Sequence, residues 1–123
     1  PPFSFQEQQI SQRRMERQRY VFFEMIGIEK SQQTISKELF ERTIWEEFTT
    51  LFGEVGASRA GLYLMHYSFE KGLGILRCSH HALDPVRTTL AFISELAEQR
   101  VAIHIMRVSG TIQNLLRLYK KKE

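Results

Sequence analysis

The chain has 123 residues, which is enough for one domain with one modest hydrophobic core. Hydrophobic residues make up 42% of the chain and charged residues 25%, a composition that excludes wholesale disorder and is typical of a soluble globular protein. No apolar run approaches the ~18 residues that a membrane helix needs, so we expect no membrane partner. Cys78 is the single cysteine and the N-terminus lacks a signal-peptide pattern, so we expect an intracellular, reducing setting.

Positive charge is concentrated at the two ends of the chain. Residues 1–20 hold four arginines against two glutamates, and residues 100–123 hold six basic residues against one glutamate. The middle, residues 21–99, holds seven basic residues against eleven acidic ones. This asymmetry indicates a polyanion partner, because a basic patch concentrates phosphate backbones and releases their counterions. The alternative is that the basic ends only keep the protein soluble.

The sequence predicts an N-terminal arm over residues 1–19 and a single folded domain over residues 20–123. The arm is rich in Gln, Arg and Ser and has too few apolar residues to bury a core. The domain opens with a strand over residues 20–26, which are dense in aromatic and branched side chains. Ser36 is then the predicted N-cap of an amphipathic helix that runs to about Phe52 and stops at the following glycine.

A β-hairpin and a second helix follow. The hairpin consists of residues 59–69 and 73–78, with a Glu-Lys-Gly turn between them. Asp84 and Pro85 form an N-cap and first-turn pair for a helix that we expect to end near Gln99.

A strand over residues 100–108, a Ser-Gly-Thr turn and a helix that begins near Ile112 complete the chain. The order βαββαβ followed by a helix predicts an α/β fold of the ferredoxin-like or RNA-recognition-motif-like type, in which two helices cover one face of an antiparallel sheet. Both faces of the first and last strands are apolar, so the second face also needs a cover. We expect the C-terminal helix, another protein or RNA to provide it.

Little in the sequence suggests catalysis by the protein. The four histidines lack the company of Cys and carboxylates that a zinc site needs. Cys78 follows Arg77, but neighbouring side chains of a strand point to opposite faces, so a reactive thiolate is not expected. There is no Walker loop, and the GxG at residues 72–74 falls in the hairpin turn, where glycine serves a positive φ. We therefore expect no catalytic residues, no metal site and no cofactor bound by the protein itself.

The feature of the sequence that most specifically suggests a binding site is a basic turn. Ser109, Gly110 and Thr111 precede the last helix and follow Arg107, so backbone N–H groups, two hydroxyls and a guanidinium are available to hold a phosphate. The alternative is an ordinary Ser/Thr cap in which glycine permits a sharp turn. Because the strand over residues 73–78 has no aromatic residue, base stacking on the sheet is not expected, and any RNA would be bound by Arg and Lys on edges, turns and tails.

Three motifs together resemble the ribonuclease P protein component 2 family of archaea and eukaryotes. They are Arg-Gln-Arg-Tyr at residues 17–20, Gly-Ile-Leu-Arg-Cys at 74–78 and Val-Ser-Gly-Thr-Ile at 108–112. The resemblance covers about residues 17–120. It implies a non-catalytic subunit of the ribonucleoprotein that removes the 5′ leader from precursor tRNA, with catalysis by the RNA.

The resemblance also implies the partners and setting. These are the ribonuclease P RNA, which would carry the Mg²⁺, a TIM-barrel-type protein subunit in a heterotetramer, and precursor tRNA as the substrate of the holoenzyme. The absence of long insertions favours an archaeal, cytoplasmic protein over a eukaryotic, nuclear or nucleolar one. The competing expectation is a ferredoxin-like domain that binds a protein or a small molecule without RNA. The expected RNA-binding residues are Arg17, Arg19, Arg77, Arg107, Ser109, Gly110, Thr111, Arg117, Lys120, Lys121 and Lys122.

Overall fold

The computed structural model describes residues 17–27 and 34–122, so most of the predicted N-terminal arm lies outside the described part of the chain. The elements in chain order are β1 (Gln18–Ile26), α2 (Lys37–Arg59), β2 (Tyr63–Ser68), β3 (Leu73–Ser79), the 3₁₀ helix η1 (His80–Ala82), α3 (Leu83–Phe92), β4 (Glu95–Leu96), β5 (Gln99–Arg100), β6 (Ala102–Ser109) and α4 (Ile112–Lys122). Among the described helices, none has the length and apolarity to cross a membrane.

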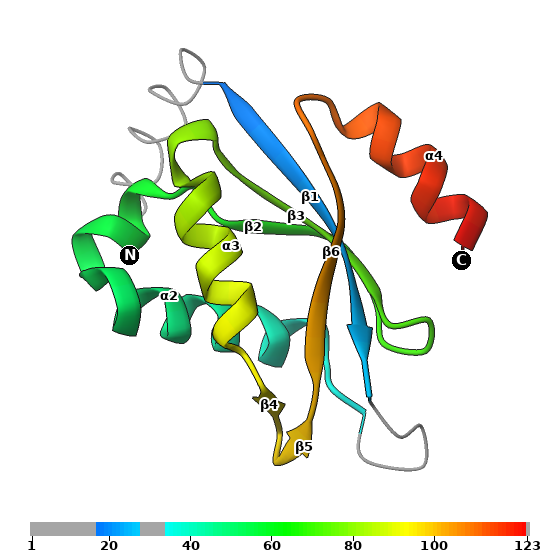
Figure 1. The fold of residues 1–123 in the computed structure, drawn as a ribbon, viewed down its shortest axis with the longest axis horizontal. Coiled ribbons are helices and arrows are strands. Elements are labelled where there is room, and N and C mark those ends of the chain that lie inside the picture. Colours follow the sequence, from blue (N-terminus) through cyan, green and yellow to red (C-terminus); the bar gives the residue numbers. More distant parts are fainter. Residues whose placement is uncertain (1–16, 28–33, 123) are drawn as a thin grey trace.

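The four long strands form one antiparallel sheet in the order β2-β3-β1-β6. Helices α2 and α3 cover one face of this sheet and α4 lies on the other (Figure 1). The sheet order and the two helices on one face are those of a ferredoxin-like fold, which confirms the predicted fold class.

Helix α2 begins as predicted and continues further than predicted. The Ser36 hydroxyl accepts a hydrogen bond from the Leu39 N–H at 3.1 Å, which is an N-cap. Gly53 interrupts the helix with φ 84° and ψ 165°, so the predicted stop is real. The chain then resumes a helical course to Arg59 and buries Ala57 in the core, and β2 consequently starts at Tyr63.

The prediction for α3 was wrong at both ends. Helix η1 leads directly into α3, so Ala82 takes the N-cap position and Asp84 lies in the first turn. The helix ends at Phe92 because the short strands β4 and β5 then turn back on each other. Their two-residue turn places Ala97 at φ 50° and Glu98 at φ 66°, a left-handed pair that residues other than glycine rarely adopt.

The hairpin between β2 and β3 confirms the predicted turn and corrects the role of one glycine. Gly72 has φ 66°, as a tight turn requires, and its carbonyl accepts a 2.7 Å hydrogen bond from the Met25 N–H of β1. Gly74 does not belong to the turn. It lies inside β3, directly opposite Phe23.

Two hydrophobic clusters lie on opposite faces of the sheet. Alternate residues of β1 divide between them, because successive strand side chains point to opposite faces. Val21, Phe23 and Met25 pack with α2 and α3 in the larger cluster. Phe22 packs with Leu73, Ile75, Leu115 and Tyr119 in the smaller one, and its ring meets that of Tyr119 edge-on at a centroid separation of 6.2 Å. Helix α4 therefore provides a cover for the second face.

Candidate RNA interface

Antiparallel pairing brings the three sequence motifs to one end of the sheet. The start of β1 lies beside the end of β3 and the end of β6, because Tyr20 is paired with Arg77 on one side and with Ser109 on the other. In Figure 1 this is the upper end, where β6 turns into α4. Residues 17–20, 77–79 and 107–111 are thus neighbours in space although they are far apart in the sequence. We call the side chains and turn gathered there the arginine surface: Arg17, Arg19, Arg77, Arg107, Ser109, Gly110 and Thr111.

The turn at the centre of the arginine surface has the geometry of a Ser/Thr cap. The Ser109 hydroxyl accepts a 3.1 Å hydrogen bond from the Thr111 N–H, immediately before α4 begins. Gly110 does not have a positive φ, so glycine is not needed there for backbone conformation. An ideal Cβ at Gly110 would meet Nη1 of Arg19 at 3.6 Å. The structure therefore places the Arg19 guanidinium next to this turn.

The four arginines of the arginine surface lie around the sheet end. Arg17 is exposed, and its carbonyl accepts a 2.9 Å hydrogen bond from the His80 N–H. Arg19 donates from Nη1 to the Gln18 carbonyl at 2.9 Å. Arg107 is exposed and is paired with Phe22, two positions further from the sheet end than the Tyr20 and Ser109 pair. Guanidinium groups around one sheet end offer directional donors to several phosphates.

A row across the sheet adds an aromatic residue that the sequence analysis did not identify. Residues directly opposite one another share a face, so Tyr63, Arg77, Tyr20 and Ser109 form a row across all four strands. The Arg77 guanidinium lies 5.0 Å from the Tyr63 ring centroid, and the Lys37 Nζ lies 5.8 Å from it. The hairpin register is the signal that could have found Tyr63, but a bulge between Leu64 and His66 obscures the register in the sequence.

The basic residues of α4 are separate from the turn. Leu115 and Tyr119 are buried against the sheet, whereas Arg117, Lys120, Lys121 and Lys122 are exposed. Eleven helical residues span about 16 Å at a rise of ~1.5 Å each, so the lysines lie well beyond the reach of a phosphate held at the turn. They form a second basic region on the exposed side of α4.

The cysteine and the histidines are the remaining candidates for catalysis or metal binding. Burial raises the pKa of the Cys78 thiol from 9.0 to about 11, and the Arg19 guanidinium opposes this effect. The thiol is therefore neutral and buried, which contradicts a role as a nucleophile. His80 and His81 are exposed, and the described residues contain no group of three potential metal ligands.

The sequence and fold identify the family. The model of the Rpp14/Pop5 family matches residues 19–119, which include nearly all of the sheet and most of α4. The chain belongs to the Rpp14/Pop5 family. This result confirms the resemblance that the three motifs indicated.

Relatives of this chain include archaeal proteins named ribonuclease P protein component 2. The protein from Archaeoglobus fulgidus is 35% identical over 103 residues, which cover 84% of this chain and 88% of the relative. The protein from Methanosarcina mazei is 27% identical over 107 residues and covers 87% of each chain. A chain in the structure of yeast ribonuclease MRP matches the fold with a TM-score of 0.64 at 10% identity, covering 87% of this chain and 92% of that one.

Proposed function

We propose that this chain is a non-catalytic protein subunit of ribonuclease P that binds and stabilises the catalytic RNA for removal of the 5′ leader from precursor tRNA. The observation that supports the proposal is the convergence of residues 17–20, 77–79 and 107–111 at one end of the sheet. They overlap the motifs at residues 17–20, 74–78 and 108–112, through which the sequence resembles its family. They bring together four arginines and a hydroxyl-bearing turn, which is the chemistry that recognises a phosphate backbone.

The proposed role is electrostatic. A folded RNA brings phosphates close together, and their mutual repulsion opposes the active fold unless cations screen it. The arginine surface would supply fixed guanidinium groups at this position, and Arg117, Lys120, Lys121 and Lys122 would contact a neighbouring stretch of backbone. Mg²⁺ would be held by the RNA phosphates, and no protein group would take part in bond cleavage.

The other proposed partners are proteins and the substrate. A TIM-barrel-type ribonuclease P subunit would join this chain in a heterotetramer, and precursor tRNA would be bound by the assembled holoenzyme in an archaeal cytoplasm. The glutamate-rich outer side of α2 repels RNA, so we assign protein contacts to that side. Glu38, Glu41, Glu46 and Glu47 are the residues concerned.

Reconstitution tests the proposal. The chain, its partner subunit and the ribonuclease P RNA are combined, and cleavage of precursor tRNA is measured as Mg²⁺ is varied. We expect the protein pair to lower the Mg²⁺ concentration at which the RNA becomes active, and we expect the proteins alone to be inactive. Cleavage by the proteins without RNA would refute the proposal, as would RNA binding with no dependence on salt between ~50 and ~200 mM.

A further inference from the structure

An exposed tyrosine stands at the outer end of the row that crosses the sheet. Tyr63 is 48% exposed, although its partner in the row, Arg77, follows a buried stretch of β3. Two residues before Arg77 on the same face, Ile75 is buried beneath α4 together with Phe22. The cover that α4 provides therefore ends before it reaches Tyr63, and the outer end of the row is open to a ligand.

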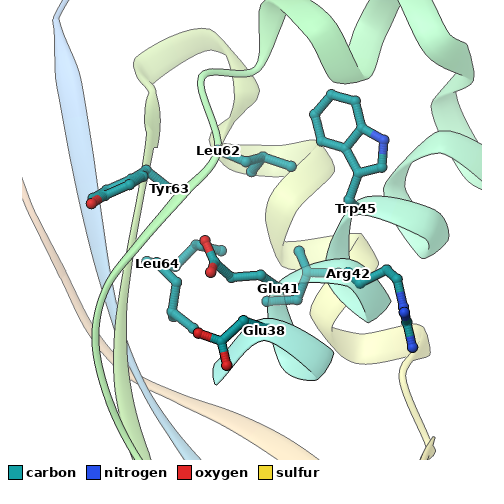
Figure 2. A pocket seen from close by; sticks show the side chains of 9 residues that line it. Glu38, Glu41, Arg42, Trp45, Leu62, Tyr63 and Leu64 are labelled. Carbon is teal, nitrogen blue, oxygen red and sulfur yellow. The ribbon is translucent and has the colours of Figure 1, made fainter. Parts of the chain in front are cut away.

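The Tyr63 ring belongs to this sheet face and not to the cavity behind it. A pocket of about 360 Å³ lies between α2 and β2, and Tyr63 is one of its lining residues, with Glu38, Glu41 and Trp45 among the others. Figure 2 shows the Tyr63 ring pointing away from both carboxylates and from the indole. Strand pairing agrees, since it places Tyr63 on the same face as Arg77.

Basic groups lie over the ring. The Arg77 guanidinium is 5.0 Å from the ring centroid and the Lys37 Nζ is 5.8 Å from it. The charged groups that line the pocket behind the strand are two acidic and one basic: Glu38, Glu41 and Arg42. Together these residues make three basic and two acidic groups around Tyr63, and both of those over the ring are basic. A planar ligand that carries negative charge is favoured at the ring.

An unpaired nucleotide combines these two properties, because a planar base is joined to a phosphate. Unpaired bases stack on aromatic rings and on the planes of arginine guanidinium groups. Arg77 lies between Tyr63 and Tyr20 in the row, so the outer end of the row offers both kinds of surface. Base stacking was not expected from the sequence because β3 has no aromatic residue. The register supplies the aromatic ring from the neighbouring strand β2 instead.

The row connects this position to the arginine surface. Arg77 belongs to both, and the row ends at Ser109 of the basic turn. Tyr63 and Ser109 are separated by three strand spacings of ~4.8 Å, or about 14 Å. One RNA strand that crosses the end of the sheet can therefore place a phosphate at the turn and a base at Tyr63.

We propose that Tyr63 and Arg77 bind one unpaired base of the RNA by stacking. Lys37, on its flexible stem, binds a phosphate next to that base. The inference rests on the proposed function and deepens it, because it adds recognition of a single-stranded nucleotide to the phosphate contacts of the arginine surface. It also assigns a role to Tyr63, which carries no charge and makes no electrostatic contribution to RNA binding.

The test compares two RNA probes that carry the same phosphates. One is pentaadenylate and the other is a pentamer of the same length without bases, and the affinity of the full chain for each is measured by fluorescence anisotropy. We expect the wild type to bind pentaadenylate about tenfold more tightly, as is typical of one base stacked on an aromatic ring. Tyr63→Leu keeps an apolar side chain but has no flat ring, so it should lose this preference.

Two further variants separate stacking from other effects. Tyr63→Phe retains the ring and should keep the preference for pentaadenylate. Phe92→Ala is the matched control, because it removes a 60% exposed ring from α3, on the other face of the sheet (Figure 1), and it should bind both probes like the wild type. Thermal melting checks folding in each variant, and the dependence of affinity on salt should not change in Tyr63→Leu.

Three results would overturn the inference. They are equal binding of the two probes by the wild type, an unchanged preference in Tyr63→Leu, and equal weakening of both probes in that variant. Failure of the proposed function would look different, because binding of the probe without bases measures the phosphate contacts alone. If that binding does not weaken between ~50 and ~200 mM salt, the proposed function fails. If it weakens normally while the bases add nothing, only the stacking site is refuted.

Discussion

The ring of Phe23 lies directly over the α-carbon of Gly74. An ideal Cβ built on Gly74 would be 2.8 Å from Cε2 and 2.9 Å from Cε1 of Phe23, and closer still to Cζ. The two residues are paired across β1 and β3, and Phe23 is fully buried and stacks on Phe40 of α2 at a centroid distance of 5.3 Å. Because Gly74 has no side chain, the Phe23 ring can lie against the backbone of β3 while it stacks on Phe40.

Gly74→Ala should destabilise the domain. The added methyl group must displace a ring that is held on its other side by Phe40, so we expect a loss of about 2 kcal/mol in the free energy of unfolding, as is usual for overpacking. Urea denaturation followed by circular dichroism measures this. Gly56→Ala is the matched control, because a Cβ there meets its nearest atom at an ordinary 3.5 Å. It should be stabilising by about 0.5 kcal/mol, as alanine replaces glycine within a helix. Equal stability of the two variants would contradict this account.

Helix α4 should depend on Leu115 for its attachment to the sheet. Leu115 is fully buried in the smaller cluster with Phe22 and Tyr119. We expect Leu115→Ala to cost about 3 kcal/mol through lost burial and the cavity left behind. Lys121→Ala, on the exposed side of the same helix, should change stability by less than ~0.5 kcal/mol. If Leu115→Ala unfolds at the wild-type urea concentration, α4 does not pack as the structure has it.

Arg107→Ala should weaken RNA binding without unfolding the protein. Arg107 is exposed, so its truncation removes a cation and little packing. The slope of log affinity against log salt should become shallower by about one unit for the lost phosphate contact. Thr111→Ala removes an exposed hydroxyl of the turn and should weaken binding less. Thermal melting controls for folding in each variant.

Gly110→Val tests whether the RNA comes into close contact with the same turn. Since Gly110 has no positive φ, the substitution should not strain the backbone, and a loss of RNA binding would reflect the bulk that it adds beside Arg19. If all three variants fold and bind RNA with unchanged affinity and salt dependence, the turn is only a helix cap.

Stability should fall at alkaline pH. Burial raises the pKa of Cys78 to about 11 and that of Tyr67 from 10.0 to about 12, and the Tyr67 hydroxyl donates a 2.7 Å hydrogen bond to the Ile35 carbonyl. Because both groups lose their protons more easily in the unfolded chain, the stabilisation is complete below pH 9 and is lost as the pH rises through 11 to 12. Urea denaturation at pH 7, 9 and 10.5 measures the decline, which Tyr67→Phe should reduce. A flat profile over this range would argue against neutral buried groups.

The sequence by itself determined the type and order of the main elements, because each has a local chemical signature. Periodic apolar residues and the hydroxyl of Ser36 define the start and the buried side of α2, and the alternation of Val21, Phe22 and Phe23 already showed that both faces of the sheet are apolar. The basic residues at the two ends and the Ser-Gly-Thr turn could also be identified from the sequence, since charge and turn chemistry do not depend on distant contacts.

Only the tertiary structure decided how distant segments combine. The end of α3 could not be read from the sequence, because Leu96 continues the apolar pattern of the helix but is buried from a hairpin whose turn forces Ala97 and Glu98 into left-handed conformations. The role of Gly74 depends on a ring from another strand.

Strand register and helix packing likewise decided which residues of distant segments lie together. Register brings Arg19 to the turn at Gly110, and the packing of α2 against the outer strand β2 creates the pocket beside Trp45. Such neighbours arise from pairing and packing across the whole domain, and no local pattern of residues encodes them.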